Sequence, residues 1–171
     1  MDFLSHGLWG GAIFGRHDRL SWRWAFFWGM APDLFAFLPA IVAGLFTGNY
    51  FAWARWLPDG ANVSLMTWYS NHAYMVTHSL VVWTGIAAAY FFLRKKFPWV
   101  FAAAALHILC DIPLHDIQYF PTPYLWPLHT PLHDGIRWAN PRVMLPNYAL
   151  IIVVYTVRVL WRKRTRTEER V

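Results

Sequence analysis

The sequence predicts an all-α integral membrane protein with about four transmembrane helices and an N-terminal half-helix. Hydrophobic residues make up 57% of the chain and charged residues only 14%, whereas a soluble domain is about a quarter charged. Twelve tryptophans recur near the ends of apolar stretches, where indole rings favour the membrane interface. Residues 1–163 therefore form a single helical membrane domain, and the basic tail 164–171 is expected to be disordered and cytoplasmic.

Five apolar stretches give the predicted helices in chain order. The first, Phe3–Gly15, is too short to cross a membrane alone, so we expect a half-helix that packs through its glycines against other helices. The later stretches are long enough, or nearly so, to span about 30 Å of hydrocarbon at about 1.5 Å per residue. These four predicted spans are Trp22–Phe46, Trp68–Leu93, Phe97–Ile117 and Asn147–Trp161.

Lysine and arginine fall into short clusters at the ends of these spans. With Arg16–Arg23 in the cytoplasm, four spans bring Arg94–Lys96 and the C-terminal basic residues to the same side, as the positive-inside rule requires. Residues 117–146 then form an external loop, and Asn49–Gly60 is expected to be an interfacial segment on that side. Because the basic residues form no continuous face, nucleic acid is not expected as a partner.

Two carboxylates lie deep in the predicted spans. Asp33 follows Pro32, which should locally open the first span, and Asp111 lies in the third span. A carboxylate at the middle of a bilayer costs at least about 2.5 kcal/mol, so each needs a partner. His107 and Asp111 are four residues apart, which places them on one helical face.

Five ionisable residues from four segments are predicted to lie at one depth, between the midplane and the outer third of the membrane. They are His6, Asp33, His78, His107 and Asp111. Three imidazoles and two carboxylates match the ligands that zinc prefers, and one carboxylate can bridge two ions. We therefore predict a divalent metal site, most simply one or two zinc ions. The alternative is that these residues form hydrogen bonds between helices without any ion.

The residues around these positions resemble a known family. The short motifs run Ser5-His6-Gly7, Ala31-Pro32-Asp33, Thr77-His78-Ser79-Leu80 and His107 to Asp111, with Phe120–Pro123 and Gly135–Trp138 in the loop. In this order they resemble the bacterial membrane-bound metal-dependent hydrolases. The resemblance implies a location in the bacterial inner membrane, while the multi-pass topology and the cytoplasmic C-terminus follow from the spans and basic clusters.

A more distant likeness is to zinc-dependent phospholipase C and the P1-type nucleases. It implies that four residues hold one metal and that His6 with Asp111 holds or approaches a second; the four are Asp33, His78, His107 and Asp111. The position of a further ligand histidine in those enzymes holds Gln118 here. His115 is the nearest substitute, and His129, His133 or Asp134 could fold back to complete another site.

The activity implied by both likenesses is hydrolysis of a lipid-borne phosphoester or ester by a metal-activated water. Membrane lipid would be both the environment and the substrate. Asp111 and His115 are the expected catalytic residues. Arg137, His133 and Asp134 are the expected substrate-binding residues; Arg137 would bind a substrate phosphate or, alternatively, anchor a headgroup.

Other functions fit parts of the pattern. A ceramidase-like amide hydrolase also uses a buried zinc site, and a structural metal site or a metal or proton transporter needs similar ligands. A haem protein could use His78 and His107, but the nearby carboxylates speak against it. Transport favours polar groups along the whole crossing, yet the inner halves of the predicted spans are apolar, which favours a dead-end catalytic pocket open to the outer leaflet.

Overall fold

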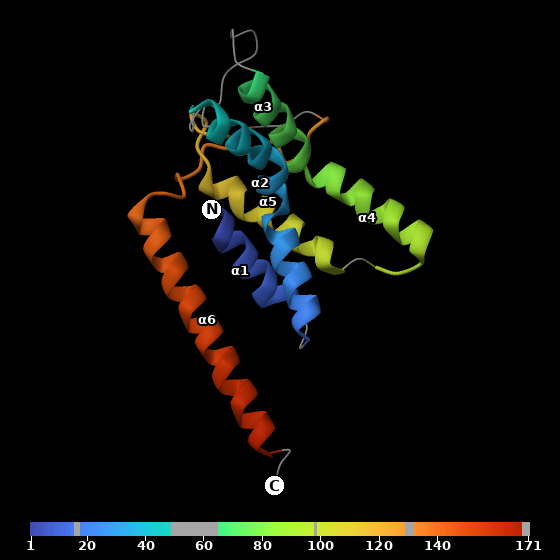
Figure 1. The fold of residues 1–171 in the computed structure, drawn as a ribbon, viewed down its shortest axis with the longest axis vertical. Helices are drawn as coiled ribbons and strands as arrows, with labels where there is room; N and C mark the ends of the chain where they lie inside the picture. Colours follow the sequence, from blue (N-terminus) through green and yellow to red (C-terminus); the bar gives the residue numbers. More distant parts are fainter. Residues whose placement is uncertain (16–17, 49–64, 98, 129–131, 169–171) are drawn as a thin grey trace.

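The computed structural model describes residues 1–15, 18–48, 65–97, 99–128 and 132–168, and in these segments it is helical without any strand. The helices are α1 (Phe3–Phe14), α2 (Arg19–Thr47), α3 (Leu65–Thr77), α4 (Leu80–Arg94), a short 3-10 helix η1 (Trp99–Phe101), α5 (Ala102–Leu114) and α6 (Pro141–Glu168). Figure 1 shows α1, α2 and α5 at the centre, with α4 and α6 extending to either side. The all-α prediction is confirmed for the described residues.

The half-helix α1 packs closely on α2, as its glycines predict. A Cβ atom on Gly10 would lie 2.6 Å from the Ala25 carbonyl oxygen, and one on Gly29 would lie 2.5 Å from the His6 carbonyl oxygen. Only glycine permits this approach of the two backbones. The contact carries His6 to the middle of α2, where Asp33 lies.

The second predicted span is broken. Instead of one helix over Trp68–Leu93, α3 and α4 meet at an angle of 62° around His78. Ser79 caps α4 by accepting from the Val82 N–H at 3.2 Å, and the Leu80 N–H donates to the Tyr124 carbonyl at 2.9 Å. The break is stable because the cap and the loop replace hydrogen bonds that a continuous helix would make within itself.

The third predicted span, Phe97–Ile117, is shortened to α5. The chain leaves the helix after Leu114, and residues 135–138 pair with its last carbonyl groups. The Ile136 N–H donates to Pro113 and the Trp138 N–H to Leu114, each at 2.9 Å. These contacts satisfy carbonyls that a helix end leaves open, so the segment can end inside the protein.

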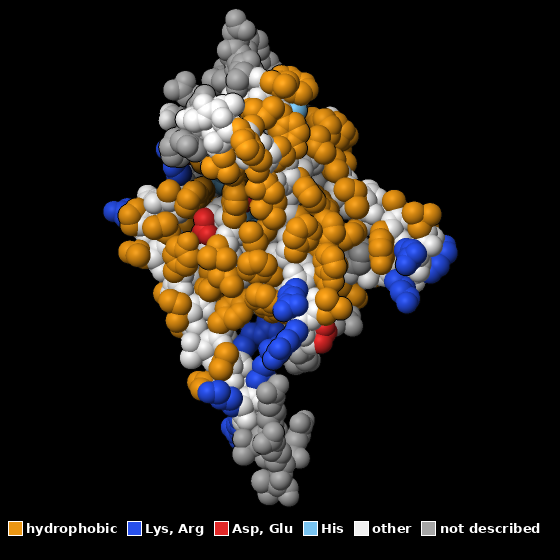
Figure 2. Space-filling model, in the orientation of Figure 1, with side chains coloured by type: hydrophobic (Ala, Val, Ile, Leu, Met, Phe, Trp, Pro, Cys, Tyr) orange, Lys and Arg blue, Asp and Glu red, His pale blue; other side chains and the backbone are white. Residues whose placement is uncertain are grey.

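Two helices are long and apolar enough to span a membrane, namely α2 and residues 141–164 of α6; the bent pair α3–α4 makes a third if it crosses as one unit. This is compatible with a membrane protein, but four full spans are not present among the described residues, because α5 with its preceding turn is only a short apolar helix. Figure 2 shows hydrophobic side chains over most of the visible face.

The last helix is longer than the predicted span Asn147–Trp161. It begins at Pro141 and continues to Glu168, so the start of the tail expected to be disordered is helical. Because α6 already begins at Pro141, the loop predicted over 117–146 ends six residues earlier than expected. The predicted interfacial segment 49–60 lies outside the described residues.

Candidate metal centre

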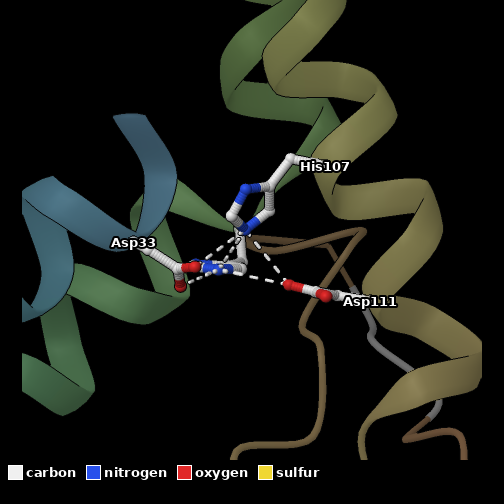
Figure 3. Close-up of side chains that lie close together, drawn as sticks. Asp33, His107 and Asp111 are labelled. Carbon is white, nitrogen blue, oxygen red and sulfur yellow. Dashed lines mark hydrogen bonds and ion pairs between the residues drawn. The ribbon is translucent and has the colours of Figure 1, made fainter. Parts of the chain in front are cut away.

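Four ionisable side chains meet in the interior. Asp33 comes from α2, His78 from the break between α3 and α4, and His107 and Asp111 from one face of α5. Each is at most 4% exposed, and each offers one ligand atom within 4.8 Å of the others. Figure 3 shows His107 and the two aspartates pointing toward a common centre.

The spacing of these atoms fits a small tetrahedral ion. His107 Nε2 lies 3.1 Å from both His78 Nε2 and Asp111 Oδ2. His78 Nε2 lies 3.3 Å from Asp33 Oδ1 and 3.7 Å from Asp111 Oδ2. A tetrahedral ion with bonds of about 2.0–2.2 Å separates its ligands by about 3.3–3.6 Å, so the cluster needs only small adjustments to hold one.

Hydrogen bonds behind the two histidines direct Nε2 toward the centre. His107 Nδ1 donates to the Gly29 carbonyl at 2.7 Å, which leaves its Nε2 as an acceptor. His78 Nδ1 lies 3.1 Å from the Thr77 hydroxyl. Such outer contacts fix the ring orientation of metal-binding histidines. The Gly29 carbonyl lies one turn before Asp33, so α2 supplies both a ligand and the group that orients another.

Without a metal ion, hydrogen bonds cannot satisfy all the buried polar atoms of the cluster. One proton on His78 Nε2 can serve only one of the acceptors around it, which belong to His107, Asp33 and Asp111. Asp111 Oδ2 is buried without a hydrogen-bond partner, and such a group costs about 1–3 kcal/mol or more when charged. A divalent cation would contact all four ligand atoms and balance two buried carboxylates, so the residues fit a metal ion.

The other oxygen of Asp111 faces a second set of groups. Asp111 Oδ1 lies 2.9 Å from His6 Nε2, 3.6 Å from His115 Nε2 and in contact with the amino group of Met1. Both imidazole nitrogens are buried without a hydrogen-bond partner. His115 Nδ1 donates to the Phe120 carbonyl at 2.7 Å, so its Nε2 carries the lone pair. Asp111 therefore lies between two groups of imidazole nitrogens.

A cavity of about 380 Å³ reaches this side of the centre. Asp33 and His115 are among its lining residues, and much of the remaining wall is aromatic: Phe37, Tyr119, Phe120 and Trp138. An apolar cavity with a few polar groups at one end is the usual form of a small-molecule site.

The other residues predicted for the site lie farther out. His133 and Asp134 are exposed, Asp134 accepts from the Ile117 N–H at 3.1 Å, and neither belongs to the buried cluster. The guanidinium of Arg137 is 5.3 Å from the centre of the Tyr119 ring. His129 lies outside the described residues.

Arg137 has a partner that sequence analysis does not single out. Its Nε donates to Asp116 Oδ2 at 2.9 Å, and this bond holds the pKa of the Asp116 carboxyl below its usual value. The pair is exposed, so it keeps the guanidinium over Tyr119 without removing it from solvent. Arg137 is thus near the cavity wall but does not touch the metal centre.

Tyr74 is a further site residue that sequence analysis misses. Its ring stacks on His78 with centroids 3.8 Å apart, and its hydroxyl lies 3.3 Å from His115 Nδ1 and donates to the Phe120 carbonyl at 2.8 Å. The signal in the sequence is its place four residues before His78. His72, by contrast, is exposed and bonds to the Trp68 carbonyl of its own helix, as its position six residues before His78 predicts.

Comparison of the chain with protein families, with curated proteins and with solved structures found no match. The likeness of its motifs to membrane-bound metal-dependent hydrolases therefore stays a prediction.

Proposed function

We propose that the protein is a membrane-embedded, metal-dependent hydrolase that acts on a lipid-borne phosphoester or ester. The observation that carries the proposal is the placement of Asp111. One of its oxygens completes the buried four-residue cluster, and the other faces His115 Nε2, which also lines the apolar cavity.

The proposed ligands of the first ion are Asp33, His78, His107 and Asp111, with zinc favoured by the nitrogen and oxygen donor set. A second ion would have fewer protein ligands. His6 Nε2 and Asp111 Oδ1 lie 2.9 Å apart and are the donors that this second ion would use. A divalent ion at this centre would lower the pKa of a bound water toward about 7 and stabilise negative charge on the ester oxygens.

The side chains around the cavity have separate roles in this proposal. His115 Nε2, free of other hydrogen bonds, takes a proton from the attacking water. Tyr74 and the Phe120 carbonyl hold the His115 ring from its Nδ1 side. Arg137, over the Tyr119 ring, contacts the phosphate of a headgroup, while the aromatic wall receives the adjoining apolar part of the lipid.

A structural metal site is the second candidate, and one observation favours it. All four ligands of the cluster come from the protein, and closed four-ligand sites are typical of structural zinc. A structural ion would raise thermal stability without any hydrolysis. An amide substrate, as in ceramidases, differs from the main proposal only in the bond that is cleaved.

Asp111→Asn separates these functions. The amide keeps the volume of the side chain but removes the charge that balances the metal, so hydrolysis should fall by at least about 100-fold, together with metal content. Purified protein would be assayed in mixed micelles against a short-chain glycerophospholipid, a short-chain carboxylic ester and a ceramide.

Asp18→Asn is the matched control, because it removes one exposed carboxylate while asparagine remains a good N-cap for α2. A folded Asp111→Asn protein that hydrolyses one of these substrates as fast as the unsubstituted protein would contradict the proposal. Activity on none of them, with a large loss of thermal stability on metal removal, would favour the structural site.

A further inference from the structure

A second cavity lies far from the metal centre, between the start of α2 and the middle and end of α6. It has a volume of about 280 Å³. Its wall contains four arginines and two aromatic residues, which we call the basic pocket: Arg19, Trp22, Arg23, Tyr155, Arg158 and Arg162. Figure 2 shows lysine and arginine side chains gathered on the lower part of the molecule, where these helices run.

The basic pocket concentrates positive charge, because like charges are spaced four residues apart on both of its helices. Arg19 and Arg23 are four residues apart on α2, and Arg158 and Arg162 are four residues apart on α6. Like charges at this spacing destabilise a helix. The acidic group in the wall is Asp18, whose carboxylate caps α2 through the Ser21 N–H at 2.7 Å. The lining keeps a net charge of +3.

The floor of the basic pocket is held by specific hydrogen bonds. Arg158 donates to the carbonyls of Gly11, Ala12 and Gly15 at the end of α1. The Trp22 indole donates to the Tyr155 hydroxyl at 3.1 Å, which in turn donates to the Leu8 carbonyl at 2.7 Å. These bonds join α1, α2 and α6, so the pocket is a formed feature of the fold.

The position of the basic pocket indicates where its ligand comes from. The candidate span α2 begins at Arg19, and the candidate span of α6 ends at Arg164, so the charged ends of both spans meet here. Leu20, Trp24 and Leu160 near it are each at least half exposed. Charged groups beside exposed apolar and indole side chains suit a molecule that lies at a membrane interface.

We propose that the basic pocket binds the headgroup of an anionic phospholipid, with preference for a lipid that carries two phosphates. Arginine binds phosphate through two parallel hydrogen bonds. Arg19 and Arg23 on α2 offer one phosphate position, and on the α6 side a second phosphate would contact Arg158 through the N–H donors that its bonds to the α1 carbonyls leave. Basic pockets between membrane helices bind such headgroups. The exposed apolar side chains beside the pocket would contact the acyl chains, which free phosphate lacks.

The proposal can be tested without reference to hydrolysis. Purified full-length protein would be titrated with cardiolipin, phosphatidylglycerol or phosphatidylcholine in detergent, and bound lipid counted by native mass spectrometry. We expect one cardiolipin to bind saturably, phosphatidylglycerol to bind more weakly, and phosphatidylcholine not to compete. Arg19→Gln with Arg23→Gln should weaken cardiolipin binding at least about tenfold.

The matched control is Arg94→Gln with Lys96→Gln, which removes the same charge from the exposed end of α4. Equal weakening by the control pair would show attraction by net charge alone and would overturn the proposal, as would unchanged binding in the pocket variant. Displacement of the lipid by millimolar inorganic phosphate would assign the pocket to a free anion instead. Thermal unfolding in detergent reports folding in both variants without reference to the metal centre, since Arg19 and Asp33 are 14 residues apart on α2, about 21 Å.

Discussion

At the scale of single residues, the two oxygens of Asp111 have different neighbours. Oδ2 faces the imidazoles of His78 and His107, while Oδ1 faces those of His6 and His115. His107 stacks on His6 with ring centroids 3.5 Å apart. The imidazoles on the two sides are thus in contact. A substitution of one ligand should therefore shift the side chains on both sides of the carboxylate.

His115 and the four cluster residues should respond differently to substitution. We place His115 as a proton acceptor, so His115→Gln should retain the metal while kcat falls by about 100-fold or more. Metal content would be measured by elemental analysis beside kcat, and loss of the ion in this variant would make His115 a ligand and contradict its assignment.

The position of Asp111 relative to His107 could be predicted from the sequence, because the spacing of four residues on a helix fixes a shared face. The pairing of Arg137 with Asp116 could not be, since it joins a loop to a helix end without any periodic pattern. Tyr74 was missed because aromatic residues are common in apolar helices, and its role depends on a ring stacked against His78.

At the scale of elements, the approach of α1 to α2 determines whether His6 reaches the centre. Gly29→Ala would place a methyl group against the His6 carbonyl, 2.5 Å from its oxygen. We expect a loss of about 1–3 kcal/mol in unfolding free energy, as in overpacked cores. Thermal unfolding in detergent would measure it.

Gly85→Ala is the control for this substitution, because a Cβ at Gly85 meets nothing within 4 Å. Alanine there should be neutral or stabilising by about 0.5–1 kcal/mol, since glycine disfavours a helix interior. Equal stability of the two variants would show that the close contact between α1 and α2 contributes little to the fold.

The break between α3 and α4 illustrates what apolar length alone cannot predict. Residues 68–93 are apolar enough for one span, and neither proline nor glycine occurs from Thr77 to Leu80. The hydrogen-bond partners that stabilise the break come from Tyr124 and Trp126, far along the chain. The break matters for the site, because it releases His78 from a regular helix and brings it to Asp33.

At the scale of the whole molecule, α2 contributes to two separate clusters of charged and polar side chains. The metal centre is near the middle of α2, and the basic pocket is at its beginning. Composition and the number of apolar stretches sufficed to predict a helical, membrane-compatible chain. They overestimated the number of full spans, because α5 ends early against residues 135–138. The predicted orientation, with basic residues in the cytoplasm, stays a prediction.

The buried His and Asp residues are expected to hold a divalent metal ion. Elemental analysis of the protein, purified without added chelator, should find close to one ion per chain, and at most two. His107→Gln should lose most of it, because Nε2 of His107 lies 3.1 Å from two other ligand atoms. His72→Gln, which alters an exposed histidine outside the cluster, should retain the ion. Metal that is absent from the unsubstituted protein, or present in equal amount in both variants, would contradict metal binding by these residues.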